Sequence, residues 1–411
     1  MTYIEFYDHL SIVNICACLA NMPDRVVLVG GDRKNVQEKM DCYQRIFHQR
    51  GYDVEFIHQP IKEKNKLPEL VKELTKIIEK YDDCAVDLTG GEDLYLVAMG
   101  AVYQACRKRK IPLHRFNIHN NSIYDCDQDG VTIATQVPSL SVEENVRIYG
   151  GDIVYDDVMP NTTHRWDMTP QFERDIDTMW NICREDPKKW NITLNALTRA
   201  WELFAQAEDS LELQIDIRIL ASAMGDQYED IKPLMEELYR KGILYFYYAA
   251  GNDVTLIFKD DQIKRCLTKA GTLLEMKVFR MLRHTQDKDG SLVYNDVMQG
   301  VFIDWDNWSK EPKSDTANEV DVLAMKGMVP VFISCKNGLV KADELYKLQS
   351  VAERFGSGYA KKILIATSLD DRLPGTAHFR QRAADMKIRI IDDLHQLSDA
   401  QIQETLKKIW H

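Results

Sequence analysis

The chain has 411 residues, 45% hydrophobic and 28% charged, a balance typical of soluble globular proteins with two or three domains. Its formal net charge of −12 excludes binding to nucleic acid through an overall basic field, so contact with DNA or RNA needs a local basic groove or metal ions. The longest apolar run, around residues 15–19, is too short to span a membrane and lacks the basic leader of a signal peptide. The nine cysteines are scattered and include no C-x-x-C pair. We therefore expect a cytoplasmic protein with reduced thiols.

The first part of the chain alternates strands and helices. Between residues 1 and 165, apolar runs alternate with stretches of helical periodicity. The expected strands are Tyr3–Tyr7, Val26–Val29, Val54–Ile57, Cys84–Leu88 and Leu113–Phe116, and the expected helices are Ile12–Ala20, Val36–Gln49, Leu67–Tyr81 and Leu94–Lys108. Apolar strands separated by helices predict a parallel, doubly wound sheet, and hence a Rossmann-like α/β domain.

The middle part, residues 166–262, is mostly helical. The expected helices are Gln171–Cys183, Leu194–Ala207, Ile215–Met224 and Tyr228–Lys241, and a hairpin turn at residues 251–253 joins the expected strands Leu244–Tyr248 and Val254–Phe258. Helices followed by a hairpin resemble a winged helix. Between residues 208 and 250, however, nine acidic side chains face four basic ones. This charge favours a connector or dimerisation module over a DNA reader.

The last part, residues 263–411, returns to mixed helices and strands. The expected helices are Leu273–Leu282, Ala342–Arg354 and Asp399–Trp410, and the expected strands are Val301–Trp305, Glu319–Met325, Val331–Cys335, Lys362–Thr367 and Ile388–Ile391. This order predicts a second α/β domain at the end of the chain.

A glycine-rich loop follows the expected strand Cys84–Leu88. Its glycines allow the backbone to approach a ligand, and the helix after it offers free N–H groups to an anion. In a sheet of order 3-2-1-4-5 this loop faces the loop after the first strand, and the loop after the second strand forms an outer lip. The alternative is that the glycines only serve tight turns. The residues expected to contact the ligand are Asp8, His9, Leu10, Ser11, Gly30, Gly31, Asp32, Thr89, Gly90, Gly91, Glu92 and Asp93.

Two details of this loop restrict the chemical class of the ligand and the contacts it can make. The loop is not G-x-G-x-x-G, which disfavours a nicotinamide dinucleotide. Glu92 would bring like charge to a phosphate, so we expect it at a ribose hydroxyl, a base amine or the helix N-terminus.

The segment Val86–Leu94, in which a strand runs into Thr-Gly-Gly and then a helix, resembles the CARF domain, the Rossmann-like fold associated with CRISPR systems. The resemblance covers roughly residues 1–165. It implies a domain that dimerises and binds cyclic oligoadenylates made during type III CRISPR interference.

Two neighbouring strands near the end carry charged residues in a regular pattern. Glu319 and Asp321 alternate along one strand, and Ser334 and Lys336 along the next, so each pair shares a face. A two-residue turn at Lys326-Gly327 would place Glu319 opposite Ser334 and point all four side chains the same way. Carboxylates in this arrangement bind Mg²⁺ or Mn²⁺, and a lysine beside them stabilises developing charge. The pattern predicts metal-dependent hydrolysis of a phosphodiester.

Two further acids are candidates for the same centre. Glu275 shares a helix face with Phe279 and Leu282, and a carboxylate that points inward needs a partner such as a metal. Asp304 ends an expected strand and competes with Asp306 for a place as metal ligand. The alternative is a surface hairpin with ordinary charges. The candidate catalytic residues are Glu275, Asp304, Glu319, Asp321, Ser334 and Lys336, with Asp304, Glu319 and Asp321 as metal ligands.

This ordered set resembles the restriction-endonuclease-like superfamily, whose signature is P-D followed by D/E-x-K. Asp321 matches the aspartate and Lys336 the lysine, but Ser334 stands where the signature has an acid. We expect Glu319 to take the place of the missing carboxylate, and the resemblance leaves the number of bound metals open.

Taken together, a CARF-like domain, a connector and this nuclease resemble the CRISPR ancillary nucleases activated by cyclic tetra-adenylate. That resemblance implies a homodimer with the cyclic nucleotide in its two-fold interface, and cleavage of single-stranded RNA and DNA with Mn²⁺ or Mg²⁺, with nicking of duplex DNA. One rival is a ligand-sensing transcriptional regulator with a degenerate nuclease domain, which the acidic connector and the intact Lys336 disfavour. Another is a nuclease subunit without a ligand, which leaves the glycine loop unexplained.

Overall fold

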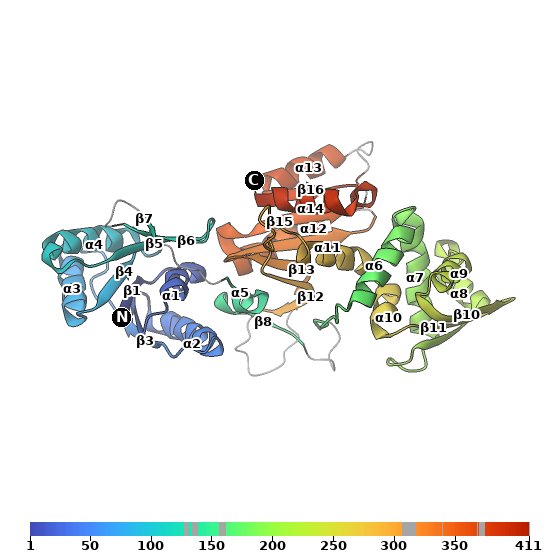
Figure 1. The fold of residues 1–411 in the computed structure, drawn as a ribbon, viewed down its shortest axis with the longest axis horizontal. Helices are drawn as coiled ribbons and strands as arrows, with labels where there is room; N and C mark the ends of the chain where they lie inside the picture. Colours follow the sequence, from blue (N-terminus) through green and yellow to red (C-terminus); the bar gives the residue numbers. More distant parts are fainter. Residues whose placement is uncertain are drawn as a thin grey trace.

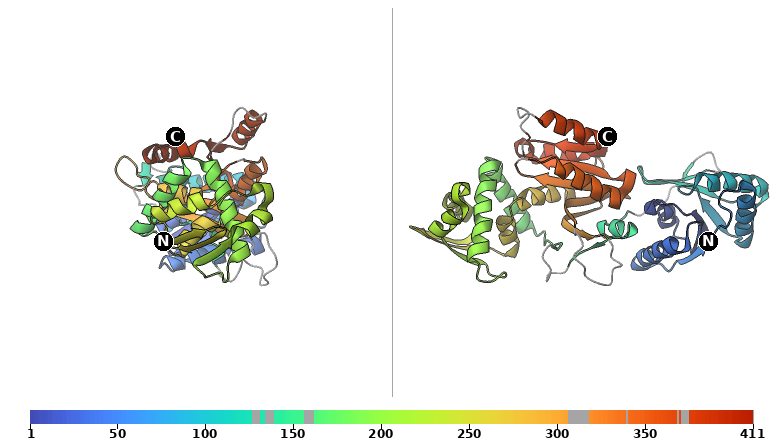
Figure 2. Two further views of the ribbon diagram at one scale, coloured as in Figure 1. Left: turned by 90° about the vertical axis from the view of Figure 1, so that its right-hand side faces the viewer. Right: turned by 180° about the vertical axis from the view of Figure 1, so that it is seen from behind.

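The chain extends along one axis in three parts (Figures 1 and 2). The structure, a computed structural model, describes residues 1–126, 131–133, 139–155, 162–305, 318–338, 340–367, 369 and 375–410. For residues 131–133 it describes the backbone and not the side chains. A sheet formed by the N-terminal residues lies at one end, a sheet formed by the C-terminal residues lies in the middle, and a largely helical part lies at the other end.

The N-terminal sheet has the order β3-β2-β1-β4-β5-β6-β7. Its strands are β1 (Thr2–Phe6), β2 (Arg25–Val29), β3 (Glu55–Gln59), β4 (Cys84–Asp87), β5 (Leu113–Asn117), β6 (Ser122–Asp125) and β7 (Val131–Ile133). The first five strands are parallel, which confirms the order 3-2-1-4-5, and β6 and β7 add an antiparallel edge that the sequence did not predict. Strands β1 and β4 are buried along their whole length, as strands covered on both faces must be.

Helices cover both faces of this sheet. They are α1 (Cys16–Asn21), α2 (Arg33–Gln49), α3 (Leu67–Lys80) and α4 (Asp93–Ala105), with the short 3₁₀ turns η1 (Ser11–Asn14) and η2 (Arg107–Arg109). One buried cluster packs α1 and α2 on one face of the sheet, and a second packs α3 and α4 on the other. The predicted doubly wound α/β domain is therefore confirmed.

The C-terminal sheet has the order β16-β15-β14-β13-β12-β8. Its strands are β8 (Asp152–Ile153), β12 (Asp296–Asp304), β13 (Asn318–Lys326), β14 (Val329–Lys336), β15 (Lys361–Ala366) and β16 (Ile388–Ile391), and its helices are α5 (Val142–Ile148), α11 (Thr272–Arg283), α12 (Asp343–Gly356), α13 (Thr376–Asp385) and α14 (Asp399–Lys407), with η4 (Ser357–Tyr359), η5 (Leu394–Gln396) and η6 (Lys408–Trp410). Helices α11 and α14 cover one face, and α5 and α12 the other.

The middle part has a three-stranded sheet of order β10-β11-β9. Its elements are α6 (Pro170–Cys183), α7 (Pro187–Phe204), β9 (Glu212–Asp216), α8 (Ile217–Met224), η3 (Gly225–Gln227), α9 (Lys232–Arg240), β10 (Leu244–Ala250), β11 (Asp253–Phe258) and α10 (Asp261–Thr268). The helix expected from Ile215 begins at Ile217, because Glu212–Asp216 pairs with β11 as a strand and Asp216 caps α8.

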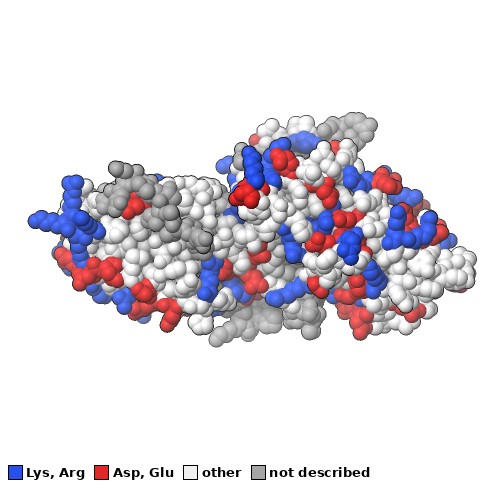
Figure 3. All heavy atoms as spheres, viewed as in Figure 1, with Lys and Arg blue, Asp and Glu red and all other residues white. Residues whose placement is uncertain are grey.

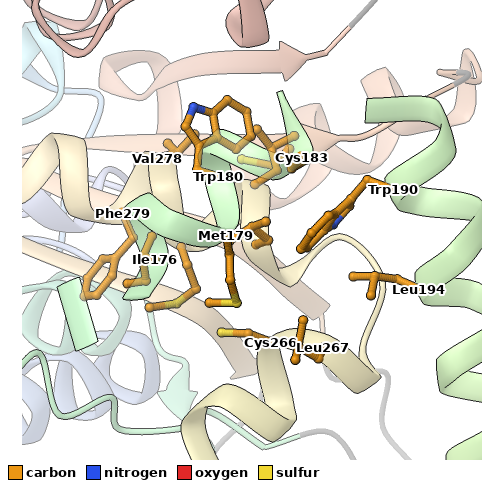
Figure 4. Close-up of a cluster of buried hydrophobic side chains, with 14 of the residues drawn as sticks. Ile176, Met179, Trp180, Cys183, Trp190, Leu194, Cys266, Leu267, Val278 and Phe279 are labelled. Atoms are coloured by element: carbon orange, nitrogen blue, oxygen red, sulfur yellow. The ribbon is translucent and has the colours of Figure 1, made fainter. Parts of the chain in front are cut away.

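One buried cluster joins the middle part to the C-terminal sheet. Figure 4 shows Trp180 and Met179 of α6, Trp190 of α7, Cys266 of α10 and Phe279 of α11 packed together. The division into residues 1–165, 166–262 and 263–411 stays a prediction, but these contacts make the middle part a rigid neighbour of the C-terminal sheet rather than a loose tether.

Residues 139–155 also pack onto the C-terminal sheet. Strand β8 pairs with the end of β12, and the Asn145 side chain donates to the Phe355 carbonyl at 2.8 Å. None of the helices that the structure describes is long and apolar enough to cross a membrane.

Gly151 tests this attachment. A Cβ atom there would lie 2.5 Å from Phe355 Cε1 and 2.8 Å from the Asp304 carbonyl oxygen, whereas at Gly358 it would meet no atom within 4 Å. We expect Gly151→Ala to lower the free energy of unfolding by about 1–3 kcal/mol and Gly358→Ala to change it by less than about 0.5 kcal/mol in urea denaturation followed by tryptophan fluorescence. Equal stability of the two variants would show that residues 139–155 do not pack here.

Candidate active site and ligand-binding loops

The two strands that carry the predicted active site are neighbours, with a register that differs from the prediction. Strands β13 and β14 pair from Lys326↔Val329 to Val322↔Ile333, so the turn is Gly327-Met328 and not Lys326-Gly327. Continued, this register sets Asp321 opposite Ser334, and the expected pairing of Glu319 with Ser334 is wrong by two residues. Because the error is an even number, it leaves the face of every side chain unchanged.

Asp321 sits where the two strands separate. No backbone pairing continues beyond Val322↔Ile333, while β14 goes on pairing with β15 as far as Lys336↔Ala366. One oxygen of Asp321, Oδ2, accepts from the Cys335 backbone N–H at 2.6 Å, from the Ser334 hydroxyl at 3.2 Å and from Lys336 Nζ at 3.2 Å. The carboxylate thus replaces the backbone partner that Cys335 loses.

Lys336 lies between two carboxylates. Its ammonium is 3.2 Å from Asp321 and 3.3 Å from Glu344 Oε2 on α12. Burial alone would lower the pKa of Lys336, but the charges of Asp321 and Glu344 raise this pKa well above its usual value. Burial opposes ionisation of Glu344, yet hydrogen bonds from Lys347 and Lys336 lower its pKa. The site therefore holds a permanent cation between anions at neutral pH.

Glu275 and Glu319 form the other side of the site. Lys269 Nζ donates to Glu319 Oε1 at 2.8 Å. Glu275, near the start of α11, is 7% exposed and accepts from the Gln299 amide. Burial, together with the negative charges of Asp321 and Glu319, raises the pKa of Glu275 well above its usual range. The four carboxyl groups of the centre outnumber the three lysines beside them, Lys269, Lys336 and Lys347.

The structure brings four predicted residues into one pocket. Glu319, Asp321, Ser334 and Lys336 line a hollow of about 250 Å³. Glu275 is not among the residues that line the hollow, but the charges of Asp321 and Glu319 contribute to its raised pKa. Asp304 is not among the lining residues, and its backbone pairs with Asp152 of β8 at the C-terminal end of β12, beside the pairing of Ile303 with Asn318. Asp306, its predicted competitor, lies outside the described residues.

Sequence reasoning missed two residues of this pocket. Glu344 and Lys347 reach it from α12, one turn apart. Their spacing on a helix is that of an ordinary surface ion pair, so no signal in the sequence set them apart.

The groups of the pocket that could bind a metal ion are carboxylates, and carboxylate oxygens are ligands that hard divalent cations prefer. The pKa of Glu275 is raised because this acid is buried and lies near the negative charges of neighbouring carboxylates. In the part of the chain that the structure describes, no three His, Cys, Asp or Glu side chains are already grouped closely enough to hold a metal. Asp321 and Glu319 are instead each paired with a lysine.

The predicted ligand loops of the N-terminal sheet lie together. Asp8, after β1, accepts from the Gly91 backbone N–H at 2.9 Å through Oδ2 and from Leu10 N–H at 2.8 Å through Oδ1. Thr89 donates its hydroxyl to Asp87 at 2.6 Å and accepts from Phe116 N–H at 2.7 Å. The loops after β1 and β4 are thus joined at the switch point of the sheet, as the strand order requires.

The glycines of these loops are needed by the fold itself. A Cβ atom at Gly90 would come 2.6 Å from Val13 Cγ2, and Gly91, with φ +109°, would press against Phe6. At Gly30 a Cβ atom would meet the Tyr95 ring at 2.6 Å, and Gly31 has φ +70°. The packing and backbone angles of these loops therefore require glycine at these positions with or without a ligand, and a bulky residue at Gly90 would disturb the loop itself as well as a ligand.

The acidic loop residues stand at helix starts. Asp32 caps α2 by accepting from Asn35 N–H at 3.2 Å. Glu92 is the N-cap residue of α4 and Asp93 its first residue. Negative charge at a helix N-terminus is favourable, which agrees with one of the places expected for Glu92.

Lys39 of α2 is a cation at these loops that sequence reasoning missed. Its Nζ donates to the carbonyls of Asp8 at 3.1 Å and His9 at 3.0 Å, and it lies 4.8 Å from the centre of the Tyr7 ring. Burial lowers the pKa of Lys39 to about 8, partly opposed by the charge of Asp8.

Comparison with solved structures identifies proteins that share the fold of the whole chain. No protein-family model matches the chain, and no curated protein matches its sequence. Among solved structures, protein VC1899 from Vibrio cholerae has a TM-score of 0.74 at 14% identity, covering 100% of this chain and 97% of that one. Can2 from Sulfobacillus thermosulfidooxidans, solved in complex with cyclic tetra-adenylate, has a TM-score of 0.65 at 16% identity, covering 100% and 99%. The chain therefore shares the fold of these two proteins over its full length.

Proposed function

We propose that the chain is a metal-dependent nuclease of type III CRISPR defence that cleaves single-stranded RNA and DNA after cyclic tetra-adenylate binds its N-terminal domain. The observation that carries this proposal is the pocket in which Asp321 and Lys336 meet at the point where β14 leaves β13. The full-length similarity in fold to Can2, a protein solved with cyclic tetra-adenylate, supports the activator.

Each residue of the pocket has a role in this chemistry. Asp321, with Glu319 and Glu275, would hold a divalent cation, which polarises the phosphate and lowers the pKa of a bound water. Lys336 stays charged and donates to the phosphate oxygens as negative charge develops there. Ser334 and the Cys335 N–H fix one oxygen of Asp321 and leave its other oxygen toward the pocket.

The N-terminal domain supplies the sensor. The loops after β1 and β4 present free backbone N–H groups at the start of α4, and Lys39 adds a positive charge beneath them. A cyclic tetranucleotide has two-fold symmetry, so a homodimer that places two such loop sets around one axis would match the ligand.

Asp321→Ala and Lys336→Ala test the centre. Each should lower the rate of cleavage of labelled single-stranded RNA and DNA with Mn²⁺ by at least about 10²–10³, because each removes a preorganised charge from the transition state. Binding of cyclic tetra-adenylate by calorimetry should not change, and neither should cleavage by Lys407→Ala, a lysine of α14 outside the pocket. Normal cleavage by purified Asp321→Ala would refute the nuclease and favour a sensor with a degenerate nuclease domain.

Glu319→Gln and Glu344→Gln test which carboxylate replaces the acid that Ser334 lacks. Glu344 lies 3.3 Å from Lys336, whereas Glu319 is already paired with Lys269. If Glu319 is the metal ligand, its variant should need about tenfold more Mn²⁺ for half-maximal cleavage, as the loss of one weak ligand implies. Glu344→Gln should then lower the rate without moving the Mn²⁺ requirement. The reverse pattern would assign the metal to Glu344.

Lys39 gives the sensor a pH dependence. Its ammonium loses a proton near pH 8, so affinity for the anionic ligand should fall as the pH rises from about 7 to about 9. Lys39→Ala should bind about tenfold more weakly at pH 7, whereas Lys39→Arg should bind with no pH dependence, because the guanidinium stays charged. Lys76→Ala, a change on exposed α3, is the matched control. A flat profile for the unchanged protein would remove Lys39 from the ligand site.

A further inference from the structure

A groove beside α11 has no role in the site above. It has a volume of about 750 Å³ and lies between α11, the first half of β12 and the segments around Tyr155 and Trp166. Its volume is within the range of sites for organic ligands. Figure 3 shows lysine, arginine and acidic side chains mixed over one face of the molecule, so a ligand with negative charge must be met by local groups such as those of this groove.

Two arginines stand at the groove, each beside an aromatic ring. The guanidinium of Arg165 lies 4.3 Å from the centre of the Tyr155 ring, and that of Arg283 lies 5.5 Å from the centre of the Phe279 ring. A guanidinium over a ring keeps its N–H donors at the edges, where they can meet phosphate oxygens. Arg283 makes no ion pair with any residue in the described part of the chain, and Arg165 is 75% exposed.

The acidic groups of the groove are engaged elsewhere. Glu143 accepts from the Tyr155 hydroxyl and lies 3.8 Å from both Arg147 and Arg165. Asp296 accepts from the Val142 N–H at 2.7 Å. Glu143 therefore balances part of the charge of Arg165, whereas neither carboxylate pairs with Arg283 in the described part of the chain.

Aromatic side chains line the space between the arginines. Trp166 stacks on Phe172 with ring centres 5.7 Å apart, and His164 meets the Trp166 ring edge-on at 4.8 Å. Rings that are half exposed beside cations are the usual surface on which single-stranded nucleic acids stack, because every base has a π-face and a nearby phosphate. Paired bases of a duplex do not offer these faces.

Hydrogen bonds connect the groove to the acids around the catalytic pocket, although the two share no lining residue. The Trp166 indole N–H donates to the Gln299 side chain, and the amide of Gln299 donates to Glu275. Phe279 and Arg283 follow Glu275 on α11 at steps of four residues, so Arg283 lies about 12 Å along the helix from that carboxylate.

From these contacts we propose that the groove binds a segment of single-stranded nucleic acid. The inference rests on the proposed nuclease function, since the groove then holds the substrate. Arg165 and Arg283 bind the phosphates, and the rings of Tyr155 and Trp166 support the bases. This assigns the substrate class to single strands of either sugar, recognised by stacking and charge rather than by sequence.

The test measures binding apart from cleavage. Binding of a short fluorescent single-stranded oligonucleotide is followed by anisotropy in EDTA with cyclic tetra-adenylate present, in protein that also carries Lys336→Ala. The double variant Arg165→Ala/Arg283→Ala should bind about tenfold more weakly, and the slope of log affinity against log salt should fall by about 1.4 for two lost phosphate contacts. Arg240→Ala/Lys241→Ala removes the same charge from the far end of α9 and should change neither quantity.

A second measurement locates the strand. An oligonucleotide with 5-iodouracil should cross-link on irradiation to Tyr155 or Trp166, as identified by mass spectrometry of the peptides. Equal affinity of the two double variants, cross-links confined to other elements, or binding of duplex in preference to single strands would overturn the proposal. If the unchanged protein never cleaves but the groove variant still loses affinity, the nuclease function falls while the groove remains a single-strand site. If cleavage is normal and the groove variant binds normally, the groove alone is refuted.

Discussion

The separation of β14 from β13 is the constraint on which the candidate active site depends. Beyond Ile333 the backbone of β14 has no partner on that side, and a buried N–H without an acceptor is costly. The Asp321 carboxylate accepts from Cys335 N–H at 2.6 Å and so satisfies it. The same oxygen also draws in Ser334 and Lys336. The Asp321 carboxylate thus lies where β13 and β14 stop pairing, at the edge of the pocket, and it binds Lys336, the cation of the pocket.

The charge around that carboxylate explains the rest of the centre. Glu275, Glu319 and Glu344 join Asp321 within reach of three lysines, Lys269, Lys336 and Lys347. Buried carboxylates left in surplus are unfavourable, so one of them keeps its proton, and Glu275 is the one most removed from water. A divalent cation bound here would favour loss of the Glu275 proton. It would also displace Lys269 from Glu319. The observed pairing is the arrangement that a metal would replace.

The sequence predicted elements better than it predicted tertiary neighbours. Alternation along β13 and β14 placed Glu319, Asp321, Ser334 and Lys336 on a common pocket even though the turn was set one residue early, because a register error of two residues preserves the face. Asp304 does not line the pocket, although Ile303 beside it pairs with Asn318, the neighbour of Glu319, and its place as metal ligand stays a prediction. Lys39, Lys269 and Glu344 could not be found, because helix and loop residues reach a site only through packing that one sequence does not display.

Packing also links the N-terminal part of the chain to the strands of the candidate active site. Residues 139–155 come after the N-terminal sheet in the sequence, yet Leu140 N–H donates to the Gly327 carbonyl in the turn between β13 and β14, and Val154 N–H donates to Phe302 in β12. The strands that frame Asp321 are therefore bonded to the segment that follows the N-terminal sheet. Under the proposed function, a ligand could change the state of the C-terminal domain only by as much as it binds one state more tightly than the other. Any movement of residues 139–155 relative to the C-terminal sheet would have to alter these bonds, so they are contacts in which that difference in free energy would be expressed.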